Sequence, residues 1–170
     1  MIGYQPALSL ALRTLERRGW LTLAWHPQGA RICLDVPPPQ EPDTFTFSDQ
    51  LRHQLKGLAL ISLKPLQTWE RVIDLAIAKR PGDEPLYHLF LEVMGKYSNL
   101  ILTDAQWQII TVAHQVNAQQ SRVRTVQTGQ PYQPPPALLA TPPLLTESLN
   151  DWQESCLLYT SPSPRDENGY

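Results

Sequence analysis

The chain is organised around one stretch of sequence, Leu91-Glu92-Val93-Met94-Gly95-Lys96-Tyr97-Ser98-Asn99-Leu100-Ile101-Leu102-Thr103-Asp104. Two apolar runs typical of strands, residues 86–94 and 100–103, flank a short polar break at residues 95–99. Glycine permits a tight turn, and Ser and Asn side chains can bond the nearby backbone, so this pattern favours a β-hairpin. The break also holds three donors that could bind a phosphate or a base edge, namely Lys96, Ser98 and Asn99. The residues alone leave both interpretations open.

The central stretch belongs to a longer series of short apolar segments separated by turn residues. These strand candidates are residues 60–63, 71–78, 86–93, 99–103 and 108–113. Short strands at such close spacing predict an antiparallel meander. One candidate opens with the pair Glu70-Arg71, which is either a surface ion pair or a polar site aimed at a ligand.

A helix is predicted just before this series, with Ser48 as its N-cap and Gly57 as its end. Its apolar face consists of Leu51, Leu55 and Leu58. We expect the meander to pack on this face. Arg52 and Lys56 are four residues apart and share another face, which is either solvated or in contact with phosphate.

The N-terminal part predicts a second hairpin. Residues 19–25 and 30–36 are strand candidates joined by a turn at residues 26–29. Arg31 follows that turn directly and could reach solvent or a phosphate. The preceding segment, residues 8–18, fits a strand or a helix equally well.

Composition narrows the class of protein. The chain has 170 residues and is 42% hydrophobic, enough for one domain with a core. Its 17 prolines cluster at residues 37–39, 134–136 and 142–143, which we read as loops and linkers. The sequence has no apolar run long enough to span a membrane and no signal peptide, so we expect a cytoplasmic protein without a membrane partner.

Metal and disulfide chemistry are not expected. The two cysteines, Cys33 and Cys156, are too few for a disulfide scaffold or a zinc site. The four histidines lie on separate segments, so we predict no metal and no cofactor. Residues 1–124 hold 13 basic and 11 acidic side chains, whereas residues 125–170 hold 1 and 5. An anionic partner would therefore meet the first part of the chain.

Several of these segments together resemble the N-terminal domain of the NFACT family of ribosome-quality-control factors, whose bacterial members have long been described as fibronectin-binding proteins. The resembling segments are residues 25–31, 47–57, 70–71, 92–99 and 129–136. The most specific of them is Met94-Gly95-Lys96-Tyr97-Ser98-Asn99, and its residues are most similar to those of the cyanobacterial branch.

The resemblance implies an α+β fold, an antiparallel sheet or sandwich with a packed helix, similar to the N-terminal domain of formamidopyrimidine-DNA glycosylases. It implies a factor that binds stalled large ribosomal subunits and recruits tRNA, expected to be alanyl-tRNA, so that an alanine tail is added to the nascent chain. Such a factor is not an enzyme, because the ribosome makes the peptide bond.

The resemblance also implies an RNA-binding site. In the family, an Asp-Arg pair needed for tailing lies at the tRNA anticodon arm, and the matching residues here are Glu70 and Arg71, so the acid is one methylene longer. The predicted RNA-binding residues are Arg31, Arg52, Lys56, Glu70, Arg71, Lys96, Ser98, Asn99, Arg122 and Arg124.

The resemblance divides the chain into three parts. Residues 1–136 are expected to be an NFACT N-terminal domain that lacks the family's opening helix and first strand. Residues 137–154 are expected to be a linker and the start of a helical segment. Residues 155–170 have no usable periodicity and resemble a translated sequencing adapter, so we expect a non-native tail.

Two other functions are considered. A glycosylase of the type named above uses an amino-terminal proline and an adjacent glutamate, and Met1-Ile2-Gly3 supplies neither. A fibronectin-binding adhesin would need export and an anchor, for which the sequence has no signal.

Overall fold

The computed structural model describes residues 6–14, 16–38, 46–67, 70–121, 123–136, 144 and 146–153. The chain forms two compact units, residues 1–137 and 138–170. In chain order the elements are β1 (Ala7–Arg13), β2 (Arg18–Ala24), β3 (Arg31–Asp35), α1 (Thr46–Leu55), β4 (Ala59–Pro65), β5 (Val72–Ala78), β6 (Tyr87–Glu92), the 3-10 helix η1 (Gly95–Tyr97), β7 (Asn99–Asp104) and β8 (Ile109–Val112). In the second unit, residues 149–153 form a short helix.

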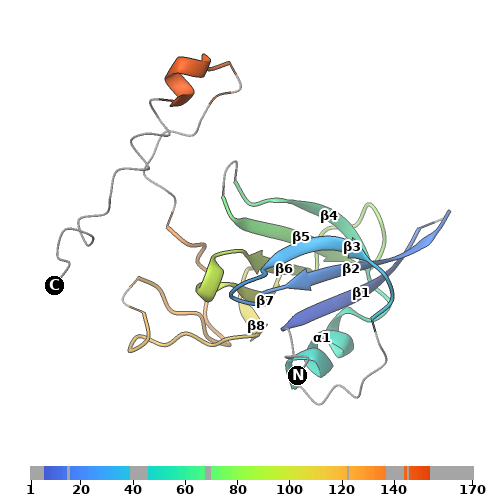
Figure 1. Ribbon diagram of the computed structural model, residues 1–170. Coiled ribbons are helices and arrows are strands. Elements are labelled where there is room, and N and C mark those ends of the chain that lie inside the picture. The colour runs from blue at the N-terminus through green and yellow to red at the C-terminus, as the bar shows by residue number, and fades with distance from the viewer. Residues whose placement is uncertain are drawn as a thin grey trace, which may run out of the picture. The chain divides into compact units, whose positions relative to one another are not determined.

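The last five strands form one antiparallel sheet in the order β4-β5-β6-β7-β8, which confirms the predicted meander (Figure 1). The predicted hairpin is its centre, because β6 pairs with β7 from Tyr87↔Asp104 to Glu92↔Asn99. The two strands are joined through η1, which begins at Gly95 with a φ of 56°. Glycine tolerates this left-handed conformation without a steric penalty.

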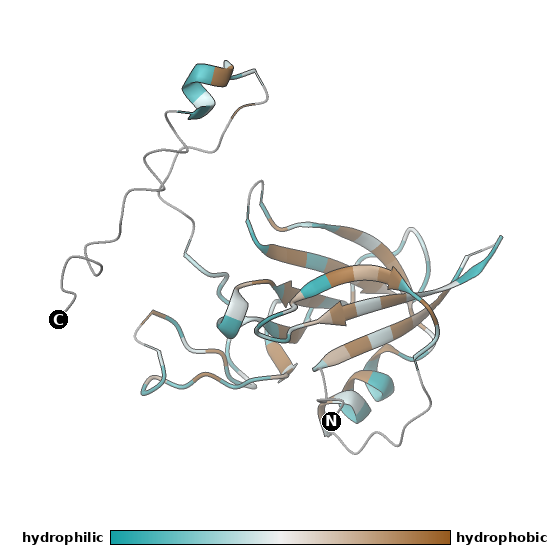
Figure 2. Cartoon of the chain, viewed as in Figure 1, coloured by the Kyte–Doolittle hydropathy of each residue, from teal (hydrophilic) through white to brown (hydrophobic). Residues whose placement is uncertain are grey.

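The first three strands form a separate antiparallel sheet in the order β1-β2-β3. Residues 7–13 are a strand, which settles the ambiguity between strand and helix at residues 8–18. Leu21, Leu23 and Trp25 pack against Leu75, Leu89 and Leu100 of the five-stranded sheet. The first unit is therefore a sandwich, and its hydrophobic residues are concentrated in the strands (Figure 2).

The helix was predicted in the right place but with the wrong start. α1 begins at Thr46, so Ser48 is its third residue and cannot be the N-cap. Its end is as predicted, because Gly57 has a φ of 81° just beyond the last helical residue. Leu51 is 1% exposed and belongs to the core between the sheets. None of the described helices is long and apolar enough to cross a membrane.

The five-stranded sheet is covered on both faces. Neighbouring residues of a strand point to opposite faces, so β6 sends Leu91 toward the three-stranded sheet and Phe90 and Glu92 the other way. Residues 114–121 and 123–136, which we call the strap, supply Val116, Val126 and Tyr132 to the cluster on this second face. Their side chains Val126 and Tyr132 are 2% and 4% exposed and pack in the cluster that contains Phe90.

The core account predicts a strong effect of Leu89→Ala, since Leu89 is 0% exposed between the two sheets. We expect the free energy of unfolding to fall by ~2–5 kcal/mol in urea titrations, because the lost contacts leave a cavity. Leu34→Ala is the control, as this side chain is 76% exposed on β3 and should change stability by less than ~0.5 kcal/mol. Equal losses in the two variants would contradict the sandwich packing.

Candidate nucleic-acid interface

A buried carboxylate fastens the strap to the sheet. Glu92, the last residue of β6, is 0% exposed. Arg124 of the strap donates from Nη1 to Oε1 at 2.8 Å and from Nη2 to Oε2 at 2.5 Å. The Tyr132 hydroxyl donates to Oε1 at 2.9 Å. A second bond from Arg124 Nη1, to the Gln133 carbonyl at 2.8 Å, ties the strap to itself. Glu92 is thus bonded by two residues of the strap.

The same contacts fix the protonation states of the network. Burial alone would lower the pKa of the Arg124 guanidinium, but the hydrogen bond and the charge of Glu92 outweigh it and raise that pKa above its ordinary value. Burial first, and then the negative charge of Glu92, strongly raise the pKa of the Tyr132 phenol. Arg124 therefore stays charged and Tyr132 stays neutral beside the carboxylate.

The predicted donor cluster of Lys96, Ser98 and Asn99 does not form, because two of its members are committed to internal bonds. Ser98 is 4% exposed, and its Oγ accepts the Met94 backbone N–H at 2.9 Å. Asn99 is 3% exposed; its Nδ2 donates to the His114 carbonyl at 2.8 Å and its Oδ1 accepts the His114 N–H at 3.0 Å. These two side chains hold the turn in place.

Arg124, another predicted RNA-binding residue, also bonds to groups inside the protein. It was predicted to bind RNA, but its guanidinium is occupied by Glu92 and by the Gln133 carbonyl. Its side chain is 12% exposed, so it acts as an internal partner. Sequence alone could not show this, because Arg124 and Glu92 are 32 residues apart.

Three of the predicted cations do gather at one end of the sandwich. Lys96 lies exposed on η1, and exposed Arg71 precedes β5, its carbonyl accepting the Val93 N–H at 2.8 Å. Arg31 begins β3 and follows a turn that lies close to η1. The carbonyl oxygen of Pro27 in this turn would be 4.0 Å from a Cβ atom placed on Gly95. We call Arg31, Arg71 and Lys96 the basic rim.

Other predicted residues lie elsewhere. Gln54 of α1 accepts a hydrogen bond of 2.9 Å from Tyr87, which begins β6 at the end opposite to Glu92. Lys56 is two residues after Gln54, so it lies away from the basic rim. Exposed Arg52 pairs with Asp49 at 3.0 Å on the helix surface. The predicted site residue Arg122 lies outside the described residues.

Glu70 is half-buried next to Arg71, and its backbone N–H donates to the Gln67 carbonyl at 3.2 Å. The described residues form no hydrogen bond or ion pair with the Arg71 guanidinium. The predicted pair therefore presents its cation, and not its acid, to a ligand.

Tyr97 was missed by the sequence analysis. Its side chain is 69% exposed, and the Lys96 Nζ lies 5.0 Å from the centre of its ring. An exposed aromatic ring beside a cation is a platform on which a nucleic-acid base can stack. A tyrosine next to a lysine in a polar turn was the signal that could have revealed it.

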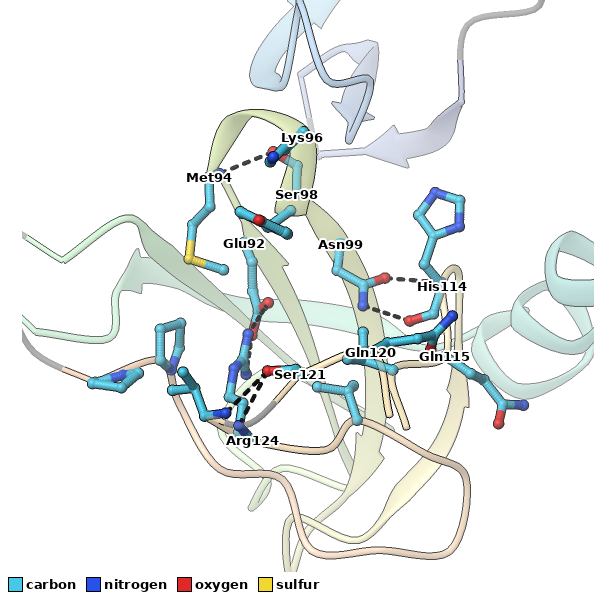
Figure 3. Close-up of a pocket in the computed structure, with 16 residues that line it drawn as sticks. Glu92, Met94, Lys96, Ser98, Asn99, His114, Gln115, Gln120, Ser121 and Arg124 are labelled. Carbon is cyan, nitrogen blue, oxygen red and sulfur yellow. Dashed lines mark hydrogen bonds and ion pairs between the residues drawn. The ribbon is translucent and has the colours of Figure 1, made fainter. Parts of the chain in front are cut away.

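A hollow of about 590 Å³ adjoins the basic rim. Figure 3 shows its labelled lining residues: Met94, Lys96 and Ser98 come from η1 and its flanks, and Gln120, Ser121 and Arg124 come from the strap across from them. The described residues contain no group of three metal-ligating side chains close enough to hold an ion.

The described residues of the first unit thus form an antiparallel sandwich with exposed cations at one end. A family model described as NFACT N-terminal and middle domains matches residues 4–165. The chain belongs to the NFACT family.

Curated relatives are about 30% identical to this chain over the residues that align. Rqc2 homolog RqcH of Streptococcus pneumoniae is 30% identical over 153 residues, which are 86% of this chain and 26% of that protein. Rqc2 homolog RqcH of Bacillus subtilis is 30% identical over 141 residues, which are 79% of this chain and 24% of that protein. The chain thus spans about a quarter of the length of these relatives.

Solved structures of similar proteins have the same fold. The N-terminal domain of the fibronectin-binding protein PavA from Streptococcus pneumoniae is 26% identical with a TM-score of 0.71, covering 94% of this chain and 59% of that one. The fibrinogen-binding protein from Staphylococcus aureus is 27% identical with a TM-score of 0.63, covering 79% and 47%. These findings confirm the resemblance to NFACT and the mixed, mostly antiparallel fold, while the likeness to glycosylases stays a prediction.

Replacing Glu92 by Gln is expected to loosen the strap, since it leaves the Arg124 guanidinium largely buried without its counter-charge. The free energy of unfolding should fall by ~3 kcal/mol, and amide hydrogen exchange should rise in the strap more than in β5. Glu84→Gln, at an exposed acid between β5 and β6, is the matched control and should change neither. Unchanged exchange in the strap of the Glu92 variant would show that the network does not hold it.

Alkaline pH should destabilise the protein through Tyr132. The unfolded phenol ionises near its ordinary pKa of 10.0, whereas the folded one stays protonated because its pKa is raised. The unfolded state therefore binds fewer protons above that pH, and stability falls by up to ~1.4 kcal/mol per pH unit. Urea titrations at several pH values should show a smaller alkaline fall in the free energy of unfolding for Tyr132→Phe than for the unchanged chain. Tyr97→Phe, which leaves the network intact, should show the full fall; the same alkaline loss in all three proteins would refute the assignment.

Proposed function

We propose that this chain is an RNA-contacting module of a ribosome-quality-control factor that works in the cytoplasm on stalled large ribosomal subunits. The module takes part in recruiting tRNA, in the first instance alanyl-tRNA, so that alanine is added to the nascent chain. Membership of the NFACT family and the RqcH names of its relatives support the general role. The observation that carries the RNA contact is the basic rim.

The basic rim suits a nucleic-acid backbone for an electrostatic reason. Its three cations come from segments far apart in sequence, and the described residues place no carboxylate within ion-pair distance of Lys96 or Arg71. Exposed cations in such an arrangement neutralise phosphates and release counterions, which makes binding favourable and sensitive to salt. Because the whole chain has a net charge of −2, this local excess would direct an anionic partner to one end of the molecule.

Within the basic rim, Arg71 is the residue we assign to tRNA. Its planar guanidinium can form paired hydrogen bonds with a phosphate or with the edge of a guanine, which a lysine cannot do. Its carbonyl accepts the N–H of Val93, the residue just after β6, so the side chain projects from a backbone that is held in place.

We propose that the module binds and positions RNA without making or breaking a bond. Glu92 is the one carboxylate among the described residues that line the hollow, and Arg124 and Tyr132 occupy both of its oxygens. A catalytic acid or base has to reach its substrate, which Glu92 does not.

A second candidate function is binding of fibronectin or fibrinogen, which the names of two similar solved structures suggest. Direct binding of fibronectin to the chain, undiminished by changes in the basic rim, would favour this alternative.

Arg71→Ala should weaken binding of the 170-residue chain to purified tRNA by about tenfold in filter-binding assays, because one charge-assisted contact is lost. The slope of log affinity against log salt should fall by about one. Arg80→Ala is the matched control, since Arg80 is an exposed arginine just beyond the other end of β5. The same variants should be compared for sedimentation with purified large ribosomal subunits.

A selective loss with Arg71→Ala supports the assignment. Equal effects of the two substitutions would show that the RNA responds to overall charge and not to the basic rim. Absence of tRNA and subunit binding by the unchanged chain would contradict the proposed function itself.

A further inference from the structure

The free edge of β3 differs from the outer edges of β4 and β8. β3 is the last strand of the order β1-β2-β3, and it pairs with β2 without a bulge. Proteins usually protect an open edge with a bulge, a proline, a charge within the strand or a covering segment. β4 has a bulge after Leu60 and ends at Lys64-Pro65, and β8 bonds to the strap through Ile109. The described residues give the middle of β3 none of these protections.

The register determines which backbone groups of β3 are free. The Trp25 N–H donates to the Pro6 carbonyl at 3.0 Å, so the odd-numbered residues of β2 bond to the β1 side. Because bonded pairs alternate along an antiparallel ladder, the even-numbered residues of β2 bond to their partners in β3. These partners are Arg31, Cys33 and Asp35. The N–H and C=O groups of Ile32 and Leu34 therefore point to the free edge, where the described residues provide no backbone partner.

Apolar side chains lie along this free edge. Leu34 pairs with the core residue Leu21, so both point to the inner face of the sandwich, yet Leu34 is 76% exposed. Val36 follows just after β3 and is 74% exposed. These two are the most exposed large hydrophobic side chains in the described part of the chain. An open strand edge with exposed apolar side chains is a template for a further strand.

The sequence of β3 is complementary to itself in the antiparallel orientation. When two copies are paired about a twofold axis at Cys33, Ile32 lies opposite Leu34 of the second copy. These residues carry the free backbone groups, so they form hydrogen-bonded pairs across the axis. Exposed Arg31 then lies opposite exposed Asp35 of the second copy. Each end of the pairing therefore has a pair of opposite charges, which stabilises neighbouring strands.

Both charged groups have hydrogen-bonding capacity left for a partner. Arg31 Nη1 donates to the Gly29 carbonyl at 3.0 Å, and the other N–H groups of the guanidinium remain. Asp35 Oδ1 accepts the Val36 N–H at 2.8 Å, and the second oxygen remains. β1, at the other edge of the same sheet, has Arg13 as its single charged residue and offers no such pair. The self-complementary edge is that of β3.

We propose that the chain forms a homodimer in which the β3 edges of two copies pair antiparallel and join their three-stranded sheets into one continuous sheet. The same patch of each copy contacts the other, as in any twofold interface. A pairing of five residues a side is small compared with permanent interfaces, so the dimer is weak and reversible. Of the basic rim only Arg31 takes part, and the RNA contacts of Arg71 and Lys96 can be tested separately.

Sedimentation equilibrium of the 170-residue chain measures the association. The dimer fraction should rise with concentration up to about 1 mM, and a chain that is still monomeric there overturns the proposal. Arg31→Asp should weaken the dimer by about tenfold, because it places two carboxylates opposite each other at both ends of the pairing. Arg13→Asp, the same change at an exposed position of β1, is the matched control and should leave the dimer unchanged.

A charge exchange distinguishes a direct contact from an indirect effect. Asp35→Arg alone should weaken the dimer as much as Arg31→Asp does. The double variant with Arg31→Asp and Asp35→Arg restores opposite charges across the axis, so it should dimerise again like the unchanged chain. A dimer that both single variants leave intact, or that the double variant fails to restore, would overturn the pairing through β3.

The register can be read from Cys33, which is a free cysteine. In the proposed dimer it faces Cys33 of the second copy at a non-hydrogen-bonded position, where Cα atoms are ~4.5 Å apart, a distance that a disulfide spans. Oxidation of the Cys156→Ser chain with copper phenanthroline should therefore yield a linked dimer on non-reducing gels. Adding Leu34→Lys should prevent the link, because it places a cation in the apolar row.

The remaining outcomes of the crosslinking also decide the matter. Equal linkage with and without Leu34→Lys would indicate random collision of exposed thiols, and linkage that requires added RNA would show that the nucleic acid bridges two chains. Either result, or a dimer in sedimentation that gives no link through Cys33, overturns the proposal.

Discussion

The carboxylate of Glu92, buried at the end of β6 and held by Arg124 and Tyr132, is the constraint on which the rest of the site depends. A carboxylate removed from water costs several kcal/mol unless it is paired and hydrogen-bonded. Both partners come from the strap, whose described residues include no regular strand or helix. The strap must therefore lie against the second face of the sheet to satisfy Glu92. In that position it covers the aromatic cluster around Phe90 and provides one wall of the hollow.

Polar side chains at this end of the sandwich divide into two groups with different roles. Ser98 and Asn99 point inward and bond backbone groups of the turn and of residue His114, so they fix the conformation of the β6–β7 connection. Lys96 and Tyr97, on the connection itself, are exposed. Less conformational entropy is lost on binding when the backbone that carries the contacting side chains is already fixed. The internal hydrogen bonds thus prepare the residues that we propose to contact RNA.

The local pattern of the sequence predicted most of the elements, because they carry their own periodicity and turn residues, but it left β1 open between strand and helix and misplaced the start of α1. The hairpin around Gly95, the five-stranded meander and the end of α1 at Gly57 were all predicted. The sequence could not predict which polar side chains would form internal hydrogen bonds and ion pairs. Arg124 is indistinguishable in sequence from an exposed arginine, and its burial follows only from pairing with a residue 32 positions away. Asn99 likewise finds its partner, His114, across a distance of 15 residues.

We propose above all that the internal polar network positions an exposed RNA-binding surface at a single end of the sandwich. The most direct measurement is a titration of the isotopically labelled chain with a short RNA hairpin, followed through its amide NMR signals. The account predicts shifted signals at Arg31, Arg71, Lys96, Tyr97 and the strap, with α1 unchanged. Signals that shift on α1 or the edge strand β4, while those of the basic rim and the strap stay fixed, would contradict it.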